Sequence, residues 1–167
     1  MIVVRDINNY VFDKSSSIAI GNFDGIHIGH QMLFDKLIRS TKKYNTNSIV
    51  LTFDPHPSKI IYSENKSFLL NTSTQKIKLI SNYGIDYLIL MSFTYTISRM
   101  APRDFVKDIL VTKLKAKHVV VGFNYRFGKN RTGSIEDLEE LSELYNFYLD
   151  VIPPVTKFGQ VVSSSYI

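Results

Sequence analysis

The chain has 167 residues, of which 44% are hydrophobic and 21% charged, and this is enough for one domain with a hydrophobic core. It contains no cysteine, so disulfides, thiolate zinc sites and cysteine nucleophiles are excluded. The net charge of +5 is compatible with an anionic partner, but the basic residues are scattered, which is typical of a solvated surface.

The sequence shows neither an apolar run typical of a membrane-spanning helix nor a typical signal peptide. The longest apolar runs are too short to cross a bilayer, and the first ten residues lack the basic start and apolar run of a signal peptide. We therefore expect a soluble protein in the cytoplasm that has no membrane partner.

Short β-branched runs alternate with longer helical patterns along the chain. In chain order we predict a strand at 17–23, a helix at 29–43, a strand at 48–53, a helix at 73–83, a strand at 86–93, a helix at 102–114, a strand at 118–123, a helix at 134–145, a strand at 147–151 and an extended segment at 160–163. This alternation predicts an α/β fold with a mostly parallel sheet flanked by helices on both faces. In such sheets ligands bind beyond the carboxyl ends of the strands.

Several local signals support these elements. The helix at 29–43 is expected to bury Met32, Leu33, Phe34 and Leu37. Thr72 and Gln75 form a capping-box pattern before the next helix, Gly84 is suited to end that helix, and Pro102 suits a first helical turn. We expect Phe123 and Phe127 to lie in the core and His118 to be structural.

A glycine- and histidine-rich segment, GNFDGIHIGH at residues 21–30, joins the first strand to the first helix. Glycines let the backbone turn tightly, and the free N–H groups at a helix start favour an anion. His27 and His30 add imidazole N–H donors. We therefore interpret the segment as a phosphate-binding loop, although it is neither a GxxxxGK[ST] nor a GxGxxG motif. The alternative is a glycine-rich turn whose histidines only cap the helix.

This segment, continued by Gln31, closely resembles the signature of the prokaryotic FAD synthetases, within the wider HxGH nucleotidyltransferase superfamily. Three further motifs carry the resemblance: TFDPHP at 52–57, VGFNYRFG at 121–128, and VSSSYI at 162–167, which resembles the family's ISSTxxR. The resemblance covers essentially the whole chain and implies a Rossmann-like nucleotidyltransferase fold. It also implies that residues 1–167 form an FMN adenylyltransferase domain without the riboflavin kinase domain that follows it in the family.

The implied reaction transfers AMP from ATP to the phosphate of FMN and gives FAD and pyrophosphate. The implied catalytic residues are His27 and His30, which would hold the ATP phosphates. The implied ATP-binding residues are Gly21, Asn22, Phe23, Asp24, Gly25, Gly29, Ser164 and Ser165. The candidate FMN-binding residues are Pro55, His56, Pro57, Asn124, Tyr125 and Arg126. Mg²⁺ is expected to accompany ATP, and we assign no residue of the sequence as a metal ligand.

Two departures from the family pattern bear on nucleotide binding. Ser165 stands where the family more often has threonine, which keeps the hydroxyl. The chain ends at Ile167, just before the position of the motif's arginine, so ATP binding is expected to be weaker if that arginine holds the nucleotide.

Two other functions stay open at this point: an HxGH nucleotidyltransferase with a different acceptor, and a non-catalytic flavin- or nucleotide-binding module. A nucleic-acid partner is not expected, because no recognised motif or basic stripe is present. The expected partners are the small molecules ATP and FMN and, in a full-length protein, a covalently linked riboflavin kinase domain.

Overall fold

A parallel sheet forms the centre of the protein in the computed structural model, which describes residues 1–54 and 72–161. Within these residues the sheet has six strands, and every neighbouring pair is parallel. In spatial order they are β1 (Ile2–Val4), β4 (Tyr87–Met91), β3 (Asn47–Phe53), β2 (Ser16–Ile20), β5 (Ala116–Gly122) and β6 (Tyr148–Ile152).

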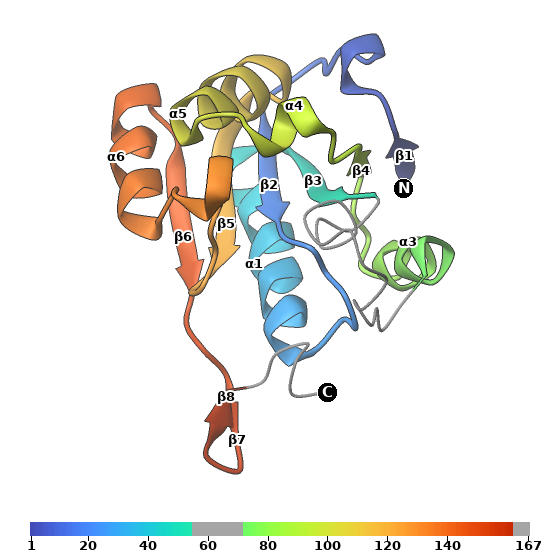
Figure 1. Cartoon of the computed structure of the whole chain (residues 1–167). Coiled ribbons are helices and arrows are strands. Elements are labelled where there is room, and N and C mark those ends of the chain that lie inside the picture. The colour runs from blue at the N-terminus through green and yellow to red at the C-terminus, as the bar shows by residue number, and fades with distance from the viewer. Residues whose placement is uncertain (55–71, 162–167) are drawn as a thin grey trace.

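Helices cover both faces of this sheet (Figure 1). One face carries α1 (Ile28–Tyr44) and α3 (Ser73–Ser81), and the other carries η2 (Phe105–Lys113) and α6 (Ile135–Tyr145). The remaining described elements are α4 (Tyr95–Ser98), α5 (Pro102–Asp104), the short 3₁₀ turns η1 (Ile7–Asn9) and η3 (Lys129–Arg131), and a hairpin of β7 (Thr156–Lys157) and β8 (Gln160–Val161).

Alternate strand residues fill two separate cores, because successive side chains point to opposite faces. On the face of α1 and α3, one core joins Ala19, Val50, Leu88, Leu90 and Val120 to Leu33, Phe34, Leu37 and Ile80. On the other face, a second core joins Ile18, Ile49, Leu51, Ile89, Val119 and Val121 to Phe105, Val106, Leu110 and Leu138. The prediction of a parallel sheet with helices on both faces is confirmed.

The predicted helix boundaries have the expected physical causes. The Thr72 side chain accepts a hydrogen bond from the Gln75 N–H, and the Gln75 side chain accepts one from the Thr72 N–H. Ser134 and Asp137 form the same reciprocal cap at α6. Gly84 has φ +73°, the predicted left-handed conformation, but α3 already ends at Ser81 with Asn82 as its C-cap.

Some details of the sequence prediction are wrong. The strand β1 was not predicted, although it pairs with β4 at an edge of the sheet. Met32 is 37% exposed and Phe123 is 40% exposed, so neither is a core residue. Phe123 follows the last residue of β5, where the covered part of the sheet ends. The predicted helix at 102–114 begins as α5 but continues as π-type turns, in which the Leu114 N–H donates to the Ile109 carbonyl at 3.0 Å.

The order of the strands reverses at β2, and this decides where a ligand can bind. From β2 the chain moves outward through β3 to β4, and it then crosses back to β5 and β6 on the other side of β2. A crevice forms beyond the carboxyl ends of the strands at such a switch point.

Within the described residues, no helix is both long and apolar enough to cross a membrane.

Candidate active site

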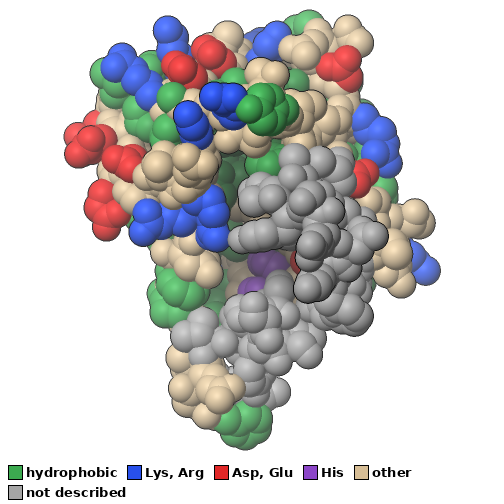
Figure 2. Space-filling view, in the orientation of Figure 1, with side chains coloured by type: hydrophobic (Ala, Val, Ile, Leu, Met, Phe, Trp, Pro, Cys, Tyr) green, Lys and Arg blue, Asp and Glu red, His purple; other side chains and the backbone are tan. Residues whose placement is uncertain are grey.

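The loop of residues 21–30, here called the histidine loop, runs from the carboxyl end of β2 to the first turn of α1. It therefore lies at the switch point of the sheet. His27 and His30 are partly exposed. Figure 2 shows histidine side chains, in purple, near the middle of this face of the molecule.

The two histidines cap the helix with the same ring nitrogen. His27 is the N-cap of α1, and its Nδ1 accepts a hydrogen bond from the Gly29 N–H at 3.0 Å. The Nδ1 of His30 accepts from the His27 N–H at 3.4 Å. A neutral imidazole that accepts at Nδ1 carries its proton on Nε2. The histidines therefore do cap the helix, as the alternative interpretation expected. This capping still leaves an Nε2–H donor on each ring for a ligand.

Two glycines in the histidine loop make room for aromatic rings. A Cβ on Gly29 would lie 2.9 Å from Cε1 of His27, and a Cβ on Gly21 would lie 3.0 Å from Cζ of Phe23. A Cβ on Gly29 would force the His27 ring to move, and a Cβ on Gly21 would require the Phe23 ring to shift by a few tenths of an ångström. Glycine at position 29, the glycine of HxGH, thus leaves room for the His27 ring to fold back over the start of α1.

The surroundings of both histidines favour the neutral imidazole. Burial lowers the pKa of His27. Burial, together with repulsion from His27 and Lys76, lowers the pKa of His30 to about 3. The histidines can therefore offer hydrogen bonds to an incoming phosphate, rather than a fixed positive charge.

Phe23 supports the histidine loop from below. It has φ +50° and no exposed surface, and its ring lies 5.1 Å from the His30 ring and 5.0 Å from the Phe34 ring, centroid to centroid. Phe23 was predicted to bind ATP, but its side chain belongs to the core. Because the Phe23 side chain is buried, only its backbone is placed to contact a nucleotide.

A lysine that the sequence analysis did not single out also lies at this site. Lys76 of α3 is only 6% exposed, and its Nζ donates to the Asn22 carbonyl at 2.7 Å. Thr52 Oγ1 donates to the same carbonyl at 3.1 Å. One signal could have found Lys76: it lies four residues before Ile80, on the helix face that packs against the sheet.

Asp54 joins three parts of the chain at the carboxyl end of β3. Its carboxylate accepts from Arg5 Nη1 at 3.1 Å and from Ser73 Oγ at 2.9 Å. Burial raises the pKa of Asp54, but the hydrogen bonds from Ser73 and Arg5 outweigh this and lower it. An ionised Asp54 thus ties the segment after β1 to the start of α3.

The candidate FMN residues are only partly described. Asn124 and Arg126 are exposed just after β5, and Tyr125 is half-buried with its ring stacked on Phe127. Burial raises the pKa of Tyr125. The strands β2 and β5 are neighbours, so this segment and the histidine loop follow adjacent carboxyl ends. Pro55, His56, Pro57, Ser164 and Ser165 lie outside the described residues.

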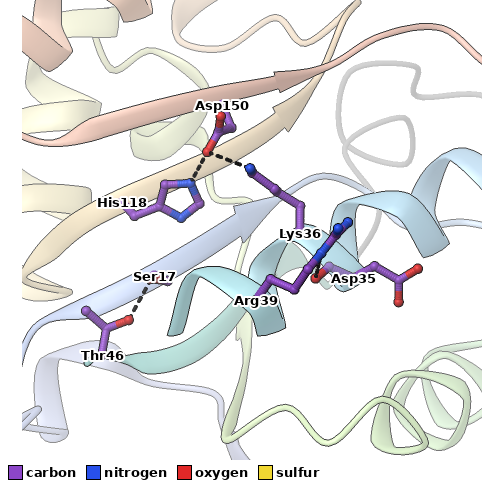
Figure 3. Close-up of polar contacts among 7 residues, drawn as sticks. All are labelled: Ser17, Asp35, Lys36, Arg39, Thr46, His118 and Asp150. Atoms are coloured by element: carbon purple, nitrogen blue, oxygen red, sulfur yellow. Dashed lines mark hydrogen bonds and ion pairs between the residues drawn. The ribbon is translucent and has the colours of Figure 1, made fainter. Parts of the chain in front are cut away.

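His118 lies near the start of β5, at the other end of the strand from this site. It has no exposed surface, and its Nε2 lies 2.7 Å from Asp150 Oδ2, an oxygen that is also 3.8 Å from Lys36 Nζ (Figure 3). Burial lowers the pKa of His118, although Asp150 opposes this. These contacts agree with the structural role predicted for His118.

In the part of the chain that is described, no group of three His, Asp or Glu residues could hold a metal ion.

Comparisons with known proteins agree with this picture. The sequence matches the FAD synthetase family over residues 11–166. It is 36% identical over 148 residues to the bifunctional riboflavin kinase/FMN adenylyltransferase of Buchnera aphidicola subsp. Schizaphis graminum, covering 88% of this chain and 47% of that protein. It is 33% identical over 159 residues to a protein named FAD synthetase from Listeria monocytogenes, covering 92% of this chain and 62% of that protein.

The fold also has a solved counterpart. A crystal structure titled as a macrolide-efflux protein from Streptococcus pneumoniae superposes with a TM-score of 0.84 at 24% identity, covering 99% of this chain and 55% of that one. This likeness shows the fold alone. The chain spans about half the length of the bifunctional relatives, 47% and 54% of the two Buchnera proteins.

Proposed function

The chain belongs to the FAD synthetase family, and from that premise we propose that it is an FMN adenylyltransferase, which transfers the AMP part of ATP to the phosphate of FMN. An oxygen of the FMN phosphate attacks the α-phosphorus of ATP. The new O–P bond forms as the bond from the α-phosphorus to the bridging oxygen breaks, and pyrophosphate leaves. The products are FAD and pyrophosphate.

One observation supports this proposal above the others: His27 and His30 both use Nδ1 to cap α1, which leaves Nε2–H of both rings for phosphate oxygens. The start of α1 adds its partial positive charge to the same place. Oriented donors of this kind stabilise the charge that builds up on the triphosphate in the transition state. We therefore assign His27 and His30 the catalytic role, acting as neutral donors.

Adenylyl transfer needs two anionic substrates to be held in line, and needs no nucleophilic side chain. We propose that ATP lies over the histidine loop, with Ser164 and Ser165 as further phosphate contacts. We place the flavin beside Asn124, Tyr125 and Arg126, with Pro55, His56 and Pro57 as further contacts. ATP would bind with Mg²⁺, which prefers phosphate oxygens and water as ligands and neutralises part of the triphosphate charge. We also propose that the reaction takes place in the cytoplasm.

The test is FAD formation from FMN, ATP and Mg²⁺, followed by chromatography together with release of pyrophosphate. Riboflavin is the matched control substrate, because it carries the same ring without the attacking phosphate. The control variant is Lys42→Ala, at the exposed far end of α1, and the test variant is His27→Ala.

We expect FAD from FMN, none from riboflavin, and a loss of turnover of about 100-fold in His27→Ala, the size of effect found when an oriented donor is removed. No FAD from wild-type protein that is folded and binds ATP would refute the proposal. It would favour a different acceptor or a nucleotide-binding module.

A further inference from the structure

Lys76 is buried where a lysine is costly to bury. Its side chain is 6% exposed, on the face of α3 that also carries Ile80. Burial lowers the pKa of Lys76, while the nearby carboxylates Asp24 and Asp54 oppose this and favour the ammonium form. A buried charge with two acids nearby implies a role other than packing, because an apolar side chain would fill the same space at lower cost.

The ammonium group holds one peptide of the histidine loop. Lys76 and Thr52 both donate to the Asn22 carbonyl, from two different elements of the fold. Because a trans peptide is planar, this also fixes the direction of the Phe23 N–H, which points the opposite way. Phe23 in turn packs against the His30 ring. Lys76 is thereby connected to the catalytic pair through two residues.

The charge of Lys76 also acts on the site directly. Among the causes that lower the pKa of His30, repulsion from Lys76 follows burial and His27. The histidines are neutral, so they supply no net charge to a bound triphosphate. The buried ammonium of Lys76 offsets the negative charge of Asp24 and Asp54, which would otherwise repel a triphosphate, and it is screened less by solvent than a surface lysine.

We propose that Lys76 is a positioning residue of the adenylyl transfer: it holds the Asn22 carbonyl so that the histidine loop keeps its shape, and its ammonium group offsets the negative charge of Asp24 and Asp54 where the triphosphate would bind. This inference rests on the proposed function. It adds a residue of α3 to the residues proposed above to bind ATP and FMN.

The test compares four variants. Lys76→Met removes the charge and the hydrogen bond but keeps the length of the side chain, and Lys76→Arg keeps the charge. Thr52→Val removes only the second hydrogen bond to Asn22, and Lys78→Met removes an exposed lysine from the same helix. Measurements are kcat and KM for both substrates, the Kd for ATP by titration calorimetry, and the pKa of His30 by NMR. Thermal unfolding shows that each variant is folded.

In Lys76→Met we expect kcat to fall about 100-fold, the loss that a small displacement of reacting groups causes. The ATP Kd should rise about tenfold through the lost charge, while KM for FMN stays unchanged. Lys76→Arg should recover part of both losses, and Thr52→Val should lose less than about tenfold in kcat because the charge remains. Lys78→Met should match the wild type.

The NMR titration separates positioning from a merely structural role. Removing the Lys76 charge in Lys76→Met should raise the pKa of His30, and Lys76→Arg, which keeps the charge, should not raise it. If Lys76 only held α3 in place, the pKa of His30 would change equally in the two variants. Wild-type kcat, ATP Kd and His30 pKa in Lys76→Met would overturn the inference while leaving the proposed function intact. If the wild type makes no FAD, the proposed function fails, and the ATP Kd and the His30 pKa still decide whether Lys76 organises the site.

Discussion

The rings of His27 and His30 stack on each other, with centroids 3.7 Å apart and planes 22° apart. Two imidazolium ions at this distance would repel each other strongly, and each Nδ1 already accepts a backbone N–H. We therefore predict that both rings are neutral at pH 7, with the proton on Nε2. Long-range ¹H–¹⁵N correlation spectra of the imidazoles report the tautomer directly.

The same spectra test the response to ligand. Bound triphosphate places negative charge beside the rings, so ATP should raise the pKa of both histidines relative to the free protein. His118 serves as the internal control, because it is buried near the opposite end of β5 and should not respond. A proton on Nδ1 of either ring in the free protein would contradict the capping geometry.

The capping role of His27 and the donor role proposed for its Nε2–H can be separated by His27→Asn. Asparagine is a favourable N-cap, and its side-chain oxygen can accept from the Gly29 N–H as His27 Nδ1 does. It has no group in the place of Nε2–H. We expect the free energy of unfolding to stay within about 1 kcal/mol of wild type, and kcat to fall about 100-fold. Denaturant unfolding and FAD formation measure the two quantities, and a stable variant with wild-type kcat would show that His27 is only a cap.

Gly29→Ala tests whether turnover depends on the position of the His27 ring over the start of α1. Alanine is favoured over glycine inside a helix by up to about 1 kcal/mol, so helix propensity alone predicts a gain in stability. The new Cβ would lie 2.9 Å from Cε1 of His27, and the ring must move away to relieve this contact. We expect kcat to fall at least about tenfold, with little loss of stability. Gln31→Ala, an exposed change two residues further along α1, is the matched control, and equal kcat in both variants would refute the steric argument.

The position of the site was predictable from sequence because it depends on local order. The histidine loop follows a strand and begins a helix, so its place at the carboxyl edge of a parallel sheet follows from chain order alone. The capping boxes at Thr72 and Ser134 are equally local, since each joins residues three apart.

The remaining features depend on tertiary contacts that no short pattern encodes. Lys76 reads as an ordinary helix lysine until Asn22, 54 residues away, is brought to its ammonium group. Phe23 reads as a pocket residue, but its φ of +50° turns the ring into the core. Phe123 shows the opposite case, because a residue beside a strand is buried only where a helix covers it.

Buried neutral histidines make stability depend on pH. Burial and the nearby charges of His27 and Lys76 lower the pKa of His30 from its ordinary value of 6.5 to about 3 in the folded protein, so between these values the unfolded chain binds more protons. His27 and His118 are shifted in the same direction. Their contribution is complete above pH 6.5 and is lost as the pH falls below it. From pH 7.5 to pH 5.5 we expect a loss of roughly 1.4 kcal/mol from His30 alone.

Urea unfolding at these two pH values measures the loss, and His30→Gln should reduce the difference while Lys78→Met leaves it unchanged. The range stays above the titration of the carboxylates, so the lowered pKa values of Asp54 and Asp137 do not contribute to it. Saturating ATP should also flatten the dependence, because a bound triphosphate favours protonated rings in the folded state. Equal stability at pH 7.5 and 5.5 in the free protein would mean that folding does not lower the pKa of His30, which would contradict its burial as a neutral ring.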